Sequence, residues 1–209
     1  MKPTLLWNSI SVVFHPLWMP LGCVGMYYLF TPQPFLPLEA VYTALVTGFA
    51  SFAIPFVILL LLKVLGKIES LGLHHTYERR LPLLLETLLL AAAVKIYLLG
   101  HVSPPAALAL CGAGVSVLTA YVCLFWDKIS LHAMGISGLT AFALMMLYHW
   151  EYPLSTALPV AAVLLAAYDL TVIARMELGR HNARQIFLGT LAGAVPQIAI
   201  LLLTGYGEG

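Results

Sequence analysis

Long apolar stretches set the strongest limit on how this chain can fold. About seven of them are long enough to cross a bilayer as a helix, which takes about 20 mostly apolar residues. Within hydrocarbon a helix satisfies all of its own backbone polar groups, so it is the element to expect. The stretches are residues 8–30, 40–62, 83–99, 105–125, 131–149, 154–174 and 186–204.

The number of spanning helices depends on the first stretch. It contains Pro16 and Pro20, and a proline inside a helix removes a backbone donor and disturbs the preceding turn. The stretch is therefore either a spanning segment or an interfacial or re-entrant one, which would leave six spans. We predict an all-α fold, a polytopic membrane helix bundle of six to seven transmembrane helices, with residues 1–209 forming a single integral membrane domain.

The composition excludes an ordinary soluble domain. Only 9% of the residues are charged, against about 25% in soluble domains, and 61% are hydrophobic. The net charge of +1 and the absence of a basic run give no reason to expect a nucleic-acid partner, so the lipid bilayer is the predicted partner. The three cysteines lie apart within apolar stretches, as packing residues do, and imply no metal. The sequence carries no signal for the oligomeric state.

Basic residues gather on one side of the predicted bundle. The loops at 63–80, 126–130 and 175–185 are separated by pairs of spans, so they share a face. The loops of the opposite face contain no Lys or Arg, and this bias places the basic face in the cytoplasm. We expect a protein of a bacterial inner membrane with this face cytoplasmic. The basic residues are Lys63, Lys67, Arg79, Arg80, Lys128, Arg175, Arg180 and Arg184.

The same face carries residues suited to phosphate chemistry. His132, His181 and several arginines lie at the mouths of separate predicted helices. Guanidinium groups hold a phosphate through two-point contacts. One imidazole can attack phosphorus while another protonates the departing oxygen. The pattern therefore favours transfer of a phosphoryl group.

Three motifs on this face resemble those of the type 2 phosphatidic acid phosphatase family, the membrane relatives of vanadium haloperoxidases. That family is typified by Lys-x6-Arg-Pro, then Pro-Ser-Gly-His, then Ser-Arg-x5-His-x3-Asp. The resemblance covers roughly residues 67–195. The matches are Arg175 and His181 in the third motif, Ser130 and His132 in the second, and Arg79-Arg80-Leu81-Pro82 as a shifted first motif.

The resemblance implies a membrane lipid phosphatase that hydrolyses a lipid phosphate monoester or pyrophosphate through a phosphohistidine. His181 would be the nucleophile and His132 the general acid for the leaving alcohol. The implied partner is a phosphorylated lipid substrate. No metal or other cofactor is implied, because cationic side chains and helix N-termini stabilise the phosphate charge. The implied phosphate-binding residues are Arg175, Arg80, Arg79 and Ser130.

Gln185 is the main departure from the family pattern, because it stands where the family has an aspartate that orients the nucleophile. It follows His181 by four residues, so its carbonyl oxygen can still accept the imidazole N–H, and we predict that hydrogen bond. The missing negative charge is expected from Asp169, our first choice as a further catalytic residue, or from Glu86. A competing interpretation makes Gln185 a helix-capping residue paired with Asn182.

The first motif lacks its lysine. Leu73 occupies that position, and Lys67, His74 or His75 are the alternatives that the loop offers. His15 lies far from the motifs along the chain, and we expect it to form only local hydrogen bonds.

Three other functions fit parts of the pattern. A phosphotransferase, in which an alcohol replaces water, uses the same residues. A non-catalytic lipid-phosphate-binding protein is favoured if His181 lacks an acceptor and no cation replaces the lysine. A small transporter is disfavoured, because transporter sites lie near the middle of the bilayer. The sequence does not distinguish among phosphatidate, phosphatidylglycerophosphate, polyprenyl pyrophosphate and lipid A.

Overall fold

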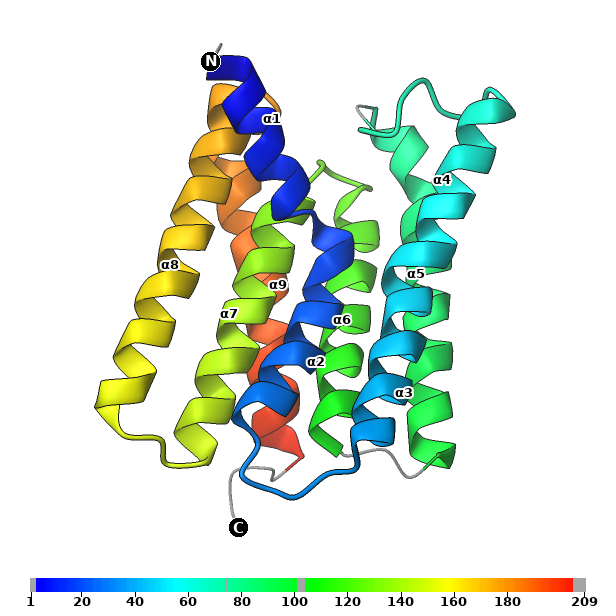
Figure 1. Ribbon diagram of the computed structural model, residues 1–209. Helices are drawn as coiled ribbons and strands as arrows, with labels where there is room; N and C mark the ends of the chain where they lie inside the picture. The colour runs from blue at the N-terminus through cyan, green and yellow to red at the C-terminus, as the bar shows by residue number, and fades with distance from the viewer. Residues whose placement is uncertain (1–2, 74, 101–103, 205–209) are drawn as a thin grey trace.

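The computed structural model describes residues 3–73, 75–100 and 104–204, and no strand occurs within them (Figure 1). The elements in chain order are α1 (Pro3–Val13), the 3-10 turn η1 (Pro16–Trp18), α2 (Met19–Phe30), α3 (Pro37–Gly48), the π turn η2 (Phe49–Ala53), α4 (Ile54–Val64), α5 (Thr76–Leu99), α6 (Pro104–Cys123), α7 (Leu131–His149), α8 (Leu154–Glu177) and α9 (Ala183–Leu203).

Seven segments of the described chain are long and apolar enough to cross a membrane. The first extends over Thr4–Phe30 and the second over Pro37–Val64, and each consists of two helices joined by a short irregular turn. The other five are the single helices α5 to α9. The prediction of an all-α polytopic bundle is confirmed, with seven such segments, and the chain is an integral membrane protein.

Pro16 breaks the first span without reversing it. His15 is extended, with ψ of 136°, as expected for the residue before a proline. Its Nδ1 accepts a hydrogen bond from the backbone N–H of Leu17 at 3.4 Å, which satisfies one donor of the new turn. Before the break α1 packs on α8, and after it α2 packs on α7 (Figure 1). The first stretch is therefore a broken helix whose two halves both run through the bundle.

Two glycines allow α7 and α9 to pack closely. A side chain at Gly193 would overlap the carbonyl oxygen of Met134, and one at Gly189 would overlap the backbone of Ser130. Small residues permit such contact between helices in membranes, where hydrophobic burial gives little driving force. The contact holds the N-termini of α7 and α9 side by side, which places the second motif next to the part of the third motif that contains His181 and Gln185.

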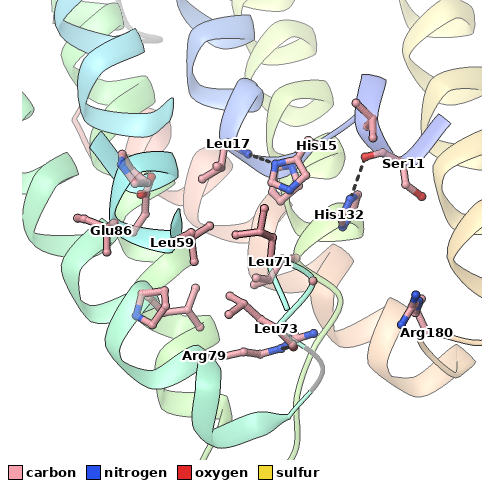
Figure 2. A pocket seen from close by; sticks show the side chains of 18 of the residues that line it. Ser11, His15, Leu17, Leu59, Leu71, Leu73, Arg79, Glu86, His132 and Arg180 are labelled. Atoms are coloured by element: carbon pink, nitrogen blue, oxygen red, sulfur yellow. Dashed lines mark hydrogen bonds between the residues drawn. The ribbon is translucent and has the colours of Figure 1, made fainter. Parts of the chain in front are cut away.

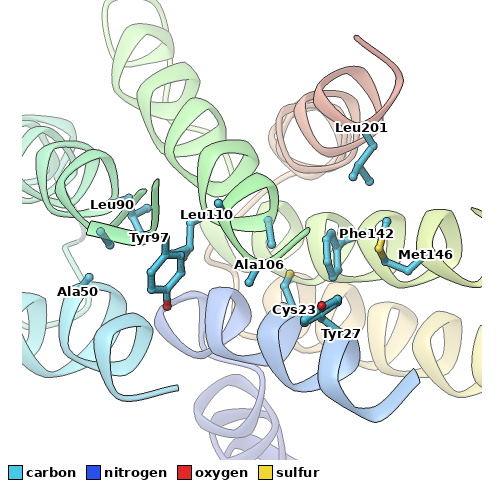
Figure 3. Packing of buried hydrophobic residues seen from close by; sticks show 13 residues of the cluster. Cys23, Tyr27, Ala50, Leu90, Tyr97, Ala106, Leu110, Phe142, Met146 and Leu201 are labelled. Atoms are coloured by element: carbon cyan, nitrogen blue, oxygen red, sulfur yellow. The ribbon is translucent and has the colours of Figure 1, made fainter. Parts of the chain in front are cut away.

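The loops sort to two ends of the bundle. The α4–α5, α6–α7 and α8–α9 loops lie at the same end as the N-terminus, whereas the α2–α3 and α7–α8 loops lie at the other (Figure 1). The predicted common face of the three basic loops is therefore confirmed, and we call it the basic end. The main apolar core lies away from it, around Leu90, Tyr97, Leu110 and Phe142, all fully buried (Figure 3).

Candidate functional site

A cavity of about 430 Å³ opens between the helices at the basic end (Figure 2). Its walls come from α1, η1, α4, α5, α7 and α8, and from the loops that follow α4 and α8. Among the described residues that line it, Glu86 is the only acidic one, so the cavity favours an anion. Its basic and histidine lining residues are Arg79, Arg175, Arg180, His15, His132 and His181.

Arg79 lies in the first turn of α5 and lines the cavity. The helix begins with a capping box formed by His75 and Glu78, which sets its first turn. The buried Arg79 donates from Nε to the Leu73 carbonyl at 2.9 Å and from Nη1 to the Ile129 carbonyl at 3.2 Å. It therefore joins two loops while lining the cavity.

Arg80, also expected to bind phosphate, is exposed and does not line the cavity. The three substitutes considered for the missing lysine also lie elsewhere or cannot be placed. Lys67 is exposed, His75 pairs with Glu69 at 3.3 Å, and His74 lies outside the described residues. Of the two arginines of the first motif, Arg79 lines the cavity and Arg80 does not.

The start of α7 gives Ser130 and His132 different surroundings. Ser130 is fully buried as the N-cap of α7, where its hydroxyl accepts from the Ala133 N–H at 3.4 Å, and it does not line the cavity. His132 lines the cavity, and its Nε2 lies 3.1 Å from the Ser11 carbonyl oxygen. Because a carbonyl only accepts, Nε2 carries the hydrogen, and Nδ1 is left to exchange a proton.

The end of α8 supplies two arginines. Arg175 donates from Nη1 to the Ser11 hydroxyl at 3.4 Å, while its buried Nε has no partner among the described residues. Gly179 has φ of 61°, a left-handed conformation that glycine adopts readily, and the turn there brings Arg180 to the cavity rim. The Nε–H of Arg175 is therefore available to donate a hydrogen bond to a ligand.

The start of α9 holds His181 through a chain of three side chains. The Nδ1 of His181 lies 3.0 Å from Oε1 of Gln185. The Nε2 of Gln185 donates to both carboxylate oxygens of Asp127, at 3.2 and 3.3 Å. Since the amide N–H points to the carboxylate, its oxygen must accept from His181, and the hydrogen of the imidazole lies on Nδ1. The Nε2 of His181 is left with its lone pair.

The predicted hydrogen bond between Gln185 and His181 is thus confirmed. The capping interaction exists beside it, because the Gln185 backbone N–H donates to Asn182 Oδ1 at 2.9 Å. The carboxylate is not one of the two expected. Asp169 is exposed on α8 and outside the cavity, and Glu86 lines the cavity but has no hydrogen bond to Gln185 or His181. Asp127, from the α6–α7 loop, takes that position.

The surroundings keep His181 neutral. Burial lowers the pKa of His181 to about 4, and the hydrogen bond with Gln185 offsets only part of this effect. The charges of Arg79, Arg175 and Lys128 lower it further. A neutral imidazole is the form that can act as a nucleophile.

Lys128 belongs to the same cluster of charges. Burial lowers the pKa of its ammonium group, as do Arg79, Arg180 and Arg175, while Asp127 raises it. Its charge also acts on His181, although the sequence suggested only a topological role for Lys128.

His15 is the residue of the cavity that sequence reasoning missed. It forms the expected local bond to Leu17, but its ring also meets His132 edge-on, with centroids 5.3 Å apart. Because Nδ1 accepts from Leu17, the hydrogen of the neutral ring lies on Nε2. The only sequence signal for this placement is Pro16, which breaks the helix at this point.

No protein-family model, curated protein or solved structure matches this chain. Within the described residues, no group of three or more His, Cys, Asp or Glu side chains could hold a metal ion.

Proposed function

We propose that this protein is a membrane lipid phosphatase that hydrolyses a lipid phosphate monoester or pyrophosphate through a phosphohistidine on His181. The observation that carries the proposal is the series of side-chain hydrogen bonds that links Asp127 through Gln185 to His181. His181 lines a cavity that is also lined by arginines. A chain of this kind fixes the imidazole tautomer and supports the positive charge that develops on the nucleophile.

In the first step, the Nε2 lone pair of His181 attacks phosphorus and the bond from phosphorus to the leaving oxygen breaks. For this step His132 carries a hydrogen on both ring nitrogens, and the departing oxygen takes the one on Nδ1 while Nε2 keeps its bond to the Ser11 carbonyl. Arg79 and Arg175 neutralise the charge on the remaining phosphate oxygens. In the second step, His132 takes a proton from water, the water oxygen attacks phosphorus, and the bond from phosphorus to Nε2 breaks. Inorganic phosphate and the free enzyme result.

The walls of the cavity favour a lipid as the carrier of the phosphate. Beside its charged rim, the cavity is lined by apolar side chains of α4 and α5, both parts of membrane-spanning segments. An acyl or prenyl chain fits such walls, and a water-soluble phosphate ester gains nothing from them. These apolar lining residues include Pro55, Ile58, Leu59, Leu85 and Leu89.

The basic end carries most of the lysines and arginines of the chain, and by the positive-inside rule we place it in the cytoplasm. A bacterial inner membrane is the setting that we propose.

A non-catalytic lipid-phosphate-binding protein is the second candidate, and one observation favours it. The partner of His181 is a neutral amide, so the negative charge of Asp127 reaches the imidazole only through Gln185. A phosphotransferase that uses the same residues with an alcohol in place of water is a further form of the proposal.

Phosphate release by the purified protein in detergent tests the proposal. The substrates are phosphatidate, phosphatidylglycerophosphate, a polyprenyl pyrophosphate and lipid A. We expect release from at least one of them by the native protein and none by His181→Ala, with cooperative thermal unfolding of both proteins as evidence that both are folded. Binding of a lipid without release by either protein would favour the non-catalytic candidate.

A further inference from the structure

Glu86 is the only acidic residue among the described residues that line the cavity, and the proposed hydrolysis gives it no role. It lies on α5 within a membrane-spanning segment, and its side chain is only 7% exposed. Its Oε2 is completely buried and has no hydrogen-bond partner among the described residues. An unpaired carboxyl group at such a position is costly, and in membrane proteins it marks a functional site. Because Glu86 lines the cavity, a molecule bound there can supply a hydrogen-bond partner to its carboxyl group.

A second cavity, of about 80 Å³, adjoins the first at Glu86. Gln197 of α9, only 2% exposed, lines this inner cavity. Its Nε2 donates to the Ala109 carbonyl at 3.0 Å, whereas its Oε1 has no partner among the described residues. The cavity has room for ordered water, which can bond to such groups. The residues that line both cavities are Pro16, Leu17, Leu83, Glu86 and Leu131.

The distance along α5 relates Glu86 to the proposed phosphate position. Arg79 and Glu86 are seven residues apart, which is about two helical turns or ~10 Å of rise, and both line the same cavity. Glu86 and Arg180 lie on opposite sides of the cavity (Figure 2). A lipid whose phosphate contacts the arginines and whose chain runs into the cavity along α5 can therefore present the atoms beyond its phosphate to Glu86.

We infer that Glu86 selects the substrate by accepting a hydrogen bond from a hydroxyl or amine close to the phosphate of the lipid. The preferred substrate class is then a lipid phosphate built on a glycerol or amino-alcohol backbone, because a prenyl or alkyl phosphate has only hydrocarbon at that place. Gln197 and water in the inner cavity complete the polar surroundings of this backbone. The inference rests on the proposed function, since it takes the phosphate to lie at Arg79 and Arg175.

Two lipids that share a chain and differ in their backbone test the inference. Oleoyl lysophosphatidate carries a free hydroxyl beside its phosphate, and oleyl phosphate carries none. We expect the native protein to have the higher kcat/KM for lysophosphatidate. Glu86→Leu should lower that value about tenfold, as expected for the loss of one buried hydrogen bond, and change the value for oleyl phosphate less than about twofold. Glu86→Gln, whose amide oxygen still accepts, should lose less than Glu86→Leu.

Glu177→Gln serves as the matched control, because Glu177 is an exposed carboxylate outside both cavities. It should leave both kcat/KM values unchanged. Equal losses on the two lipids in Glu86→Leu, or no loss on either, would overturn the specificity role. A native preference for oleyl phosphate would overturn it as well.

Thermal stabilisation by each lipid separates this inference from the proposed function. If the native protein releases no phosphate from any lipid, the proposed hydrolysis fails. Stabilisation by lysophosphatidate over oleyl phosphate, lost in Glu86→Leu, would then still support the role of Glu86 in binding. Equal stabilisation by both lipids, or by neither, would overturn that role.

Discussion

Two polar clusters lie at opposite ends of the same apolar bundle. In the cluster away from the basic end, the Tyr28 hydroxyl bonds to Glu39 at 3.2 Å and to Thr43 at 3.0 Å, and the Tyr97 hydroxyl donates to the Thr43 carbonyl at 2.6 Å and bonds to Thr47. At the basic end, buried atoms of Arg175 and Glu86 have no partner among the described residues.

This difference in hydrogen bonding distinguishes polar groups that stabilise the fold from polar groups that bind a ligand. A buried polar group in a membrane protein is costly unless it is hydrogen-bonded, so a satisfied cluster joins helices and contributes stability. The cluster at the basic end retains unsatisfied donors and acceptors, which is expected of a site that a ligand completes. Changes at the basic end should therefore affect the rate, and changes at the other end should affect stability.

The largest effect is expected for His181→Ala. Loss of the nucleophile should lower kcat by about 10⁴-fold or more, because no other group can form the covalent intermediate. The variant should remain folded, since it loses one side-chain hydrogen bond, to Gln185, at a cost of about 1 kcal/mol. Phosphate release and thermal unfolding of the same preparation measure both properties. Residual turnover near the native rate would remove His181 from the role of nucleophile.

His132→Ala should rank second, with a loss of roughly 10²- to 10⁴-fold on an alkyl phosphate, which is typical of general acid catalysis. A nitrophenyl phosphate needs no proton on its leaving group, so its hydrolysis should suffer much less. The comparison of the two substrates is the measurement. Equal losses on both would show that His132 does not protonate the leaving oxygen.

Gln185→Leu should rank third, with a loss of about 10- to 100-fold, since the imidazole loses the acceptor that fixes its tautomer. Asp127→Leu should act through the same chain, so the double variant should lose little more than the more severe single variant. Arg184→Gln, at an exposed neighbouring position outside the cavity, is the control and should keep the native rate. Additive losses in the double variant would argue against a shared chain.

The titration of His181 should affect stability at acid pH. Its pKa is lowered to about 4, against about 6.5 in an unfolded chain. Between these values the unfolded chain binds the extra proton, so the native state loses stability as the pH falls from about 6.5 to about 4, and His181 adds no further loss below. Unfolding temperatures at about pH 7.5 and about pH 5 measure the effect. The native protein should lose more than His181→Gln, and equal losses would contradict the shift.

The smallest effect is expected at the other end of the bundle. Tyr97→Phe removes a buried hydroxyl that bonds to the Thr43 carbonyl and to Thr47. It should cost about 1–3 kcal/mol of stability, as the loss of two hydrogen bonds does, and leave kcat unchanged. A large loss of rate in this variant would contradict the separation of the two clusters.

The fold follows from the sequence because each span is a local feature, an apolar stretch of sufficient length. The hydrogen bond from His181 to Gln185 was predictable for the same reason, since a four-residue spacing at the start of a helix brings the two side chains together. The break at Pro16 was visible, but the way that the two halves pack was not. That packing brings His15 into the cavity.

Contacts between distant segments account for the rest. Asp127 reaches Gln185 from another loop, 58 positions away, and no spacing marks that pair. Arg79 and Arg80 point about 100° apart on a helix, so only the rotation of α5 against its neighbours decides which of them faces the cavity. The structure turns Arg79 inward and leaves Arg80 exposed.

Trapping of the covalent intermediate tests the central claim most directly. Native protein is mixed with a ³²P-labelled lipid phosphate that it hydrolyses, quenched in alkali, which preserves phosphohistidine, and digested for mass spectrometry. We expect label on the peptide that contains His181, and none in His181→Ala. Gln185→Leu should accumulate the label more slowly than the native protein. Phosphate release by native protein with no label on His181 at any time, or with label on another residue, would contradict the proposal.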